Sequence, residues 1–202
     1  MKQDGAEGLA PETERRLRLF VALLLRWNRR INLIARADEP QVWERHVLDS
    51  AQLLPLLPAS TGLLVDLGSG AGFPGLVLAI ATGWQVHLVE SDARKASFLR
   101  QVARETATEV TIHAARAETL VLPPARVVTA RALAPLSQLL ALAVRFLAPD
   151  GVCLFPKGKS AAEELTEACR EWHMRVEQFP SRTSPTATLL RLREICRVPT
   201  SG

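Results

Sequence analysis

Short apolar runs alternate with amphipathic stretches along most of the chain. Runs bounded by glycine, proline and polar residues predict strands over 63–66, 85–90, 110–113, 127–130, 152–155, 174–179 and 188–193. Apolar positions at helical spacing predict helices over 11–28, about 40–57, 74–80, a stretch that Asp92 is expected to cap, 135–147 and 160–172. A turn is expected at 149–151, and Ser160 with Glu163 is expected to form a capping box. This β–α alternation, closed by a hairpin, predicts an open and largely parallel sheet with an antiparallel strand near one edge.

The first predicted helix has an apolar face and a strongly basic face. Leu17, Phe20 and Leu24 lie along the apolar face. The other face, with the residues just after the helix, carries Arg15, Arg16, Arg18, Arg26, Arg29 and Arg30. A solvated polar face and a surface that contacts RNA both fit this pattern.

The second predicted helix carries polar side chains that share one face. Asp38 is expected to cap its first turn. Asp49 follows Arg45 by four residues and His46 by three, so we expect the three side chains to share a face. A single histidine on a helix is more often a structural residue than a catalyst.

Length and composition suit one compact unit. The 202 residues are 48% hydrophobic and 23% charged, which fits a main domain over 61–202 with a helical extension, 1–60, packed on it. The net charge is +4, and only four of the 25 basic residues are lysine. An excess of this size permits an anionic partner without requiring one.

Cysteine spacing and apolar length argue against a metal site and a membrane span. Cys153, Cys169 and Cys196 are widely spaced and form no metal-binding motif, so we expect reduced thiols and no metal. No apolar run reaches the ~18 residues that a membrane span needs, and no signal peptide is recognised. We therefore expect a cytoplasmic protein, and a monomer rather than an oligomer.

A glycine-rich loop follows the first predicted strand and precedes a helix. Glycines suit positions where the backbone takes a positive φ or where a ligand lies against it. The spacing Gly70-x-Gly72-x-x-Gly75 matches a dinucleotide fingerprint, but Asp66 would repel a pyrophosphate and attract a sulfonium or ammonium. The pattern favours S-adenosylmethionine over NAD; a plain glycine turn, with Asp66 capping backbone N–H groups, is the alternative. The predicted cofactor contacts here are Asp66, Gly68, Ser69, Gly70, Gly72 and Phe73.

Two further segments are expected to contact the cofactor. Glu90 ends the second strand, 20 residues after Gly70, at the spacing where an acid meets the ribose hydroxyls in such folds. A carboxylate can accept hydrogen bonds from both vicinal hydroxyls. Ala117 and Glu118 lie in the turn after the third strand, where adenine contacts are expected.

Blocks spread along most of the chain resemble one bacterial family. The loop from Gly68 to Gly75 is similar almost letter for letter to the family's cofactor loop, and 45–50 is similar to its Arg-His-x-x-Asp-Ser element. Further matching blocks are 27–33, 90–91, 94–95, 98–99, 116–118, 129–132 and 157–158. The chain thus resembles the small-subunit rRNA guanine-N7 methyltransferases, called RsmG or GidB. It departs from them at Glu90, where they usually have aspartate, and at Arg126, where they usually have an acid that we expect near the site.

The resemblance implies a class I S-adenosylmethionine-dependent methyltransferase fold, Rossmann-like, with a mostly parallel seven-stranded sheet and helices on both faces. It also implies methylation of N7 of a guanine, of the position 527 type, in the 530 loop of 16S rRNA, in the small ribosomal subunit or its precursor. Guanine N7 holds no proton to be removed, so alignment matters more than a general base. Arg131, at the end of the fourth strand, is the expected catalytic residue; by the family pattern it touches the cofactor, and it could equally hold an RNA phosphate. Expected RNA contacts are Arg29, Arg30, Arg45, His46, Arg94, Lys95 and Lys157.

Three other functions stay open at the level of sequence. One is a methyltransferase of the same fold that acts on a small molecule or a protein. Another is a non-catalytic RNA-binding module, against which the intact glycine loop and Glu90 argue. The third is an NAD-dependent oxidoreductase, which Asp66 disfavours.

Overall fold

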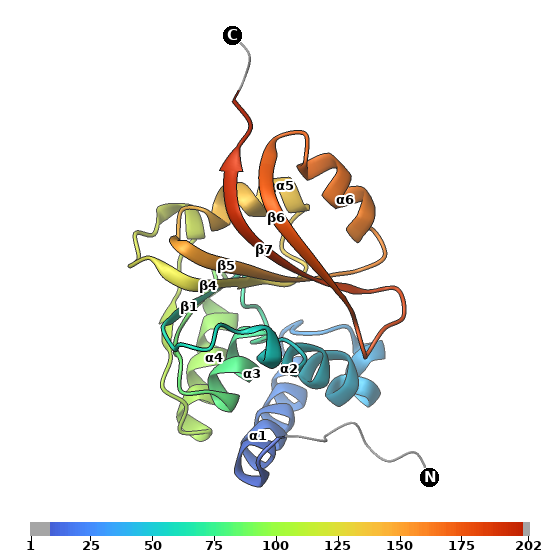
Figure 1. The fold of residues 1–202 in the computed structure, drawn as a ribbon. Coiled ribbons are helices and arrows are strands. Elements are labelled where there is room, and N and C mark those ends of the chain that lie inside the picture. The colour runs from blue at the N-terminus through green and yellow to red at the C-terminus, as the bar shows by residue number, and fades with distance from the viewer. Residues whose placement is uncertain (1–8, 200–202) are drawn as a thin grey trace.

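One seven-stranded sheet organises residues 9–199, which the computed structural model describes (Figure 1). The strands are β1 (Leu63–Leu67), β2 (Gln85–Val89), β3 (Thr111–His113), β4 (Ala125–Ala130), β5 (Leu147–Lys157), β6 (Trp172–Pro180) and β7 (Thr188–Arg197). Their order in the sheet is β3-β2-β1-β4-β5-β7-β6, with β1 to β5 parallel and β7 antiparallel to both β5 and β6. The predicted largely parallel sheet with an antiparallel strand near one edge is confirmed.

Helices cover both faces of this sheet, and each face has its own apolar cluster. One face carries α1 (Pro11–Asn28), α3 (Gly75–Ala81) and α4 (Ala93–Glu105), and the other carries η4 (Ala117–Thr119), α5 (Leu136–Ala143) and α6 (Ala161–Ala168) (Figure 1). The predicted cap of α4 is confirmed, because the Asp92 side chain accepts from the backbone N–H groups of Arg94 and Lys95 at 2.8 and 3.3 Å. Within the described residues, no helix is both long and apolar enough to cross a bilayer.

The first helix has the predicted bounds and contributes to the core. Leu17, Phe20 and Leu24 are fully buried. The ring of Phe20 lies 5.1 Å from that of Phe73, after β1, and 6.2 Å from that of Phe98, on α4. These contacts hold the N-terminal helix against the loop after β1 and against α4; the division of the chain at residue 60 stays a prediction.

The segment predicted as one second helix is a series of short, irregular turns. They are η1 (Arg36–Gln41, a 3-10 helix), η2 (Trp43–Leu48, a π-helix), α2 (Asp49–Ala51) and η3 (Leu54–Leu56, a 3-10 helix). Pro40 lies within the first of them, and a proline cannot donate to an α-helical hydrogen-bond ladder. The predicted cap is also wrong: the Asp38 carboxylate lies 3.0 Å from the Arg45 guanidinium and 3.6 Å from His46 Nε2 instead of capping a backbone N–H.

Strand β5 is longer than predicted. It begins at Leu147, and the preceding helix, α5, ends at Ala143. Ala125 pairs with Leu147, and Val127 pairs with Val152. The residues predicted as a turn, 149–151, therefore form a bulge within β5.

The sixth helix begins where predicted but is shorter and is capped differently. It ends at Ala168, and Trp172 already belongs to β6. The predicted capping box between Ser160 and Glu163 is wrong. The Ser160 hydroxyl makes no capping hydrogen bond to a backbone N–H and instead donates to Glu164 Oε1 at 2.7 Å.

Candidate active site

The carboxyl ends of four parallel strands meet at one edge of the sheet. The glycine loop follows β1, Glu90 follows β2, Arg131 follows β4, and Lys157 ends β5. In open α/β sheets, ligands bind outside the carboxyl ends of the strands, at the point where the strand order reverses. Here that point lies between β1 and β4, so the candidate site lies at this edge.

The glycine loop needs glycine for conformation and leaves space above its backbone. Gly68, Gly70 and Gly72 have φ of 65°, 54° and 93°, the left-handed region that a Cβ disfavours. At Gly70 the nearest atom to an added Cβ would be the Gly68 carbonyl oxygen at 3.7 Å. The loop therefore presents an open stretch of backbone at Gly70.

Asp66 lies beneath this loop rather than at its surface. Its side chain is 0% exposed, and its Oδ1 accepts from the Thr129 hydroxyl of β4 at 2.8 Å. Burial raises the pKa of Asp66 to about 6, although the Thr129 hydroxyl favours the charged form. Ser69 is also turned inward, with its hydroxyl donating to the Asp66 carbonyl at 3.0 Å. That Asp66 attracts a cationic ligand stays a prediction, and it would act through its field rather than by contact.

Glu90 joins the end of β2 to the glycine loop. Its Oε2 accepts from the Gly70 backbone N–H at 2.8 Å, and its Oε1 accepts from that of Asp92 at 2.7 Å. Each oxygen keeps further acceptor capacity. In the next turn along the edge, η4, Ala117 is buried and the Glu118 carboxylate is exposed. An open glycine backbone beside a strand-end carboxylate fits the ribose and methionine parts of S-adenosylmethionine.

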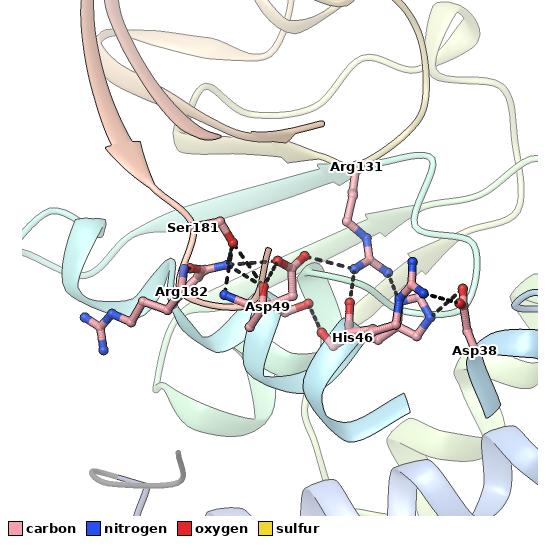
Figure 2. Close-up of polar contacts among 10 residues, drawn as sticks. Asp38, His46, Asp49, Arg131, Ser181 and Arg182 are labelled. Atoms are coloured by element: carbon pink, nitrogen blue, oxygen red, sulfur yellow. Dashed lines mark hydrogen bonds and ion pairs between the residues drawn. The ribbon is translucent and has the colours of Figure 1, made fainter. Parts of the chain in front are cut away.

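Arg131 is held by a cluster of polar groups from the N-terminal turns (Figure 2). Its side chain is 19% exposed. Nη1 donates to Asp49 Oδ2 at 3.2 Å and to the Arg45 carbonyl at 3.3 Å, and Nη2 lies 2.8 Å from His46 Nδ1. The guanidinium also lies 5.1 Å from the centre of the Phe73 ring, in the cofactor loop. Arg131 is therefore fixed between the loop and η2.

His46 is neutral in this cluster, and the lone pair of its unprotonated ring nitrogen already accepts a hydrogen bond. A guanidinium can only donate, so Nδ1 accepts from Arg131 and the ring proton lies on Nε2, which faces Asp38 at 3.6 Å. Burial, with the charge of Arg131, lowers the pKa of His46 to about 4. The ring stacks on Phe73 with centroids 5.1 Å apart. His46 thus positions Arg131 and the buried Phe73 ring.

The same cluster reaches the loop between β6 and β7 (Figure 2). Asp49 Oδ1 accepts from the Thr183 hydroxyl at 2.6 Å and from Gln52 Nε2 at 2.8 Å. The Gln52 side-chain oxygen accepts from the Arg182 backbone N–H at 2.9 Å. The sequence places Asp49 on one face with Arg45 and His46 and within a matching block, but assigns it no role. Thr183 was missed, because nothing in the chain signals a contact across 134 positions.

A pocket of about 740 Å³ opens beside Arg131, on the side of β4 and β5. Its walls include Leu133, Pro135, Pro156 and Pro185. The N-terminal segment 41–49 contributes Glu44 and Arg45. The glycine loop does not line this pocket, but Arg131 lines it and also lies against Phe73 of that loop. The predicted RNA contact Lys157 lies in the wall: its ammonium donates to Glu164 Oε2 at 2.8 Å and to the Ala134 carbonyl at 2.9 Å.

The other predicted RNA contacts fall in a separate place. Arg30, Arg94 and Lys95 line a smaller pocket of about 330 Å³ with Asp92. Arg29 is exposed at the end of α1. Elsewhere on that helix, Arg15 and Arg18 pair with Glu12 and Glu14, and Arg16 is turned inward onto the carbonyls of Thr106 and Ala107.

The expectation that Arg126 changes the charge near the site is wrong. Arg126 lies at the start of β4, five positions before Arg131, and its guanidinium lies 3.6 Å from Asp150 in the β5 bulge. A strand rises about 3.3 Å per residue, so the two arginines stand at opposite ends of β4. Arg126 therefore does not belong to the active site.

Known proteins resemble this chain along most of its length. Residues 13–189 match the family described as rRNA small subunit methyltransferase G. A protein named "Ribosomal RNA small subunit methyltransferase G" from Rhodospirillum centenum is 62% identical over 190 residues, 94% of this chain and 88% of that protein. One of the same name from Granulibacter bethesdensis is 57% identical over 191 residues, 95% and 90% of the two chains.

Solved structures share the fold at low sequence identity. A SAM dependent methyltransferase from Aquifex aeolicus has a TM-score of 0.61 at 14% identity, covering 78% of this chain and 94% of its own. M. jannaschii TYW2, solved in complex with AdoMet, has a TM-score of 0.58 at 14% identity, covering 76% of each chain. The class I, Rossmann-like methyltransferase fold expected from the sequence is confirmed.

Proposed function

The chain belongs to the rRNA small subunit methyltransferase G family, and from this premise we propose that it methylates N7 of a guanine in the 530 loop of 16S rRNA. Membership makes it a transferase that acts on ribosomal RNA with S-adenosylmethionine as methyl donor. The proposal adds which atom accepts the methyl group, and where in the RNA that atom lies.

The residues at the edge of the sheet have separable roles. S-adenosylmethionine supplies a methyl group made electrophilic by its sulfonium. The free acceptor capacity of Glu90 suits the ribose hydroxyls, the open backbone at Gly70 suits the methionine part, and the turn at Ala117 and Glu118 suits adenine. Arg131 separates this space from the pocket and keeps a fixed geometry between the two.

One observation carries the choice of N7. Within residues 9–199, no histidine or cysteine lines the pocket, and its acidic side chains are Glu44, Asp49 and Glu164. Asp49 is paired with Arg131; burial raises the pKa of Glu164, but hydrogen bonds from Lys157 and Ser160 outweigh it and lower that pKa overall. The adjacent His46 has a pKa of about 4. An exocyclic amine or a hydroxyl must lose a proton on methylation, whereas guanine N7 need not, so N7 suits a site that relies on alignment.

The decisive experiment uses small ribosomal subunits purified from cells that lack the gene. Incubation with the protein and S-adenosylmethionine should place one 7-methylguanosine in the 530 loop, located by mass spectrometry of nuclease fragments. Subunits reconstituted with 7-deazaguanosine at that position should accept no methyl group, because the acceptor nitrogen is replaced by carbon. Methylation at an exocyclic amine, or elsewhere in the RNA, would contradict the proposal.

The rival substrates are tested in the same assay. A methyltransferase of small molecules or proteins would transfer label to free metabolites or to ribosomal proteins and leave the RNA unlabelled. Naked 16S rRNA, a precursor particle and the complete subunit can be compared as substrates. We further propose that the chain acts as a monomer in the cytoplasm. Light scattering of the active protein would test the oligomeric state, and cell fractionation would test the location.

A further inference from the structure

Leu133 is an exposed apolar side chain at the junction of the cofactor loop and the pocket. Within residues 9–199, the only large apolar side chains that are exposed are Leu133, at 42%, and Val121, at 95%. Leu133 lines the pocket of about 740 Å³. Its Cδ1 lies only 2.6 Å from the position that a Cβ on Gly68 would take. The leucine side chain therefore covers the start of the glycine loop and faces the pocket as well.

The backbone just before Leu133 has an unfavourable conformation that leaves this side chain outside the core. Ala132 has φ of 52°, a region that residues with a Cβ rarely adopt. Such strain persists where the surrounding structure holds it, and it is common at ligand sites. Three residues further on, Leu136 is fully buried, so apolar residues of this segment do reach the core. Singly exposed apolar side chains are common on protein surfaces; Leu133 differs from Val121 in that it lines the pocket.

The pocket beside Leu133 has the properties of a site for a nucleobase. Pro135, Pro156 and Pro185 give it apolar surface, and Arg131 borders it on the side of the cofactor loop. Enzymes that act on a base take the base out of its stack and hold it between apolar or aromatic side chains. Within the described residues, no aromatic side chain lines this pocket, so its apolar contacts with a base would come from aliphatic side chains.

We propose that Leu133 packs against one face of the extruded target guanine and holds it beside the methyl donor. This rests on the proposed function, because the base is the one that receives the methyl group. The contact is apolar and therefore reads the shape and position of the base rather than its hydrogen-bonding edge. Leu133 should affect the placement of N7, while Glu90 and the glycine backbone hold the cofactor independently of it.

The test is a pair of truncations at the two exposed apolar positions. Leu133→Ala should lower the single-turnover rate at subsaturating small subunits about 10- to 100-fold, the usual range when an apolar group is removed from a substrate pocket. Its S-adenosylmethionine affinity, measured by calorimetry without RNA, should change less than about threefold. Val121→Ala, the matched control, should leave both quantities unchanged. Leu133→Met, which keeps the apolar volume, should recover most of the rate, whereas Leu133→Gln, of similar length, should not.

Each contrary outcome has a different meaning. If Leu133→Ala weakens cofactor binding as much as it slows transfer, the side chain serves the cofactor and the inference fails. It also fails if Leu133→Ala and Val121→Ala behave alike, or if glutamine restores the rate as well as methionine does. If the unmodified protein itself forms no 7-methylguanosine in the subunit, the proposed function fails; this arm does not involve Leu133 at all.

Discussion

Arg131 is the residue whose surroundings explain most about the site. A single guanidinium satisfies a carboxylate, a carbonyl and an imidazole, and lies against the Phe73 ring. These acceptors are arranged around a planar, forked donor, which a compact ammonium cannot replace. Because the side chain is largely buried, its loss leaves Asp49 without its charged partner. The residue therefore contributes to folding as well as to geometry.

Arg131→Lys should lower the single-turnover transfer rate about 10- to 100-fold, because a small misplacement at the reacting centre is costly. It should also lower the free energy of unfolding by about 1–3 kcal/mol, through hydrogen bonds left unmade by buried groups. Single-turnover kinetics and denaturant unfolding measure the two effects. Arg126→Lys is the control on the same strand. It replaces a guanidinium by an ammonium at the far end of β4 and should leave the rate unchanged. Equal rates for both variants would remove Arg131 from the mechanism.

The protonation of His46 gives a prediction about pH. Its pKa of about 4 and its hydrogen bond from Arg131 exclude it as a base at neutral pH. The transfer rate in single turnover should therefore be nearly flat from about pH 6 to 8, without the bell shape of an essential acid and base. His46→Asn, which retains an acceptor for Arg131, should keep this flat profile. A rate that climbs through pH 6.5 and loses that climb in the variant would show that histidine acts as a base.

Stability should depend on pH with the opposite sign for two buried groups. The pKa of His46 is lower in the folded state than the ordinary 6.5, so its contribution is present above about pH 6.5 and is lost as the pH falls toward 4. Asp66 has a raised pKa, about 6 against 3.8, so its contribution is lost as the pH rises over that interval. Comparison of wild type with His46→Asn isolates the first group. The stability advantage of wild type should shrink by about 2–3 kcal/mol between pH 7 and 4.5.

At the scale of elements, local regularity decided what could be predicted. The bounds of α1 follow from proline at its start and an uninterrupted apolar stripe. The irregular turns over 36–56 could not be predicted, because their shape is set by Pro40 and by contacts of Asp38 with Arg45 and His46. The bulge in β5 depends likewise on pairing with β4. The bulge is therefore determined by a partner strand, whereas the turns depend on contacts among their own residues that spacing alone does not reveal.

The role of α1 in the core can be tested at Phe20. Its ring is fully buried between Phe73 and Phe98, so Phe20→Ala should lower the free energy of unfolding by about 3–5 kcal/mol. If the extension and the main domain form one unit, unfolding should stay a single cooperative transition. Denaturant titration followed by both tryptophan fluorescence and circular dichroism measures this. A separate early transition that alone responds to the substitution would show that the helix is an independent unit.

At the scale of the whole molecule, the site is assembled from segments that the sequence keeps far apart. The glycine loop and Glu90 could be found from sequence because they lie 20 positions apart with a recognisable spacing. Asp49 and Thr183 meet across 134 positions, and Leu133 became notable only once its exposure was known. The pocket is lined by the segment after β4, the end of β5, the loop between β6 and β7, and the N-terminal turns. Its existence depends on the tertiary fold.

Charge is distributed so that only part of the basic surface is available to RNA. On α1, Arg15 and Arg18 are exposed but are paired with Glu12 and Glu14. Arg29 and Arg30, just beyond the helix, have no side-chain hydrogen bond or ion pair with any residue from 9 to 199. A cation that already has a carboxylate partner releases few counterions on binding a phosphate. Neutralising Arg29 and Arg30 should therefore weaken RNA binding more than neutralising Arg15 and Arg18.

The double variant Arg29→Gln, Arg30→Gln should weaken binding to the small subunit and reduce the slope of log K against log salt by about 1–2. Its S-adenosylmethionine affinity should be unchanged, since no hydrogen bond or ion pair joins either residue to the glycine loop or to Glu90 within residues 9–199. Arg15→Gln with Arg18→Gln removes the same formal charge from the same helix and should alter the slope much less, because each arginine already neutralises a glutamate. Filter binding over a salt series measures both slopes. If the two double variants reduce the slope equally, net charge rather than these two side chains attracts the RNA, and the basic residues after α1 return to being a solvated surface.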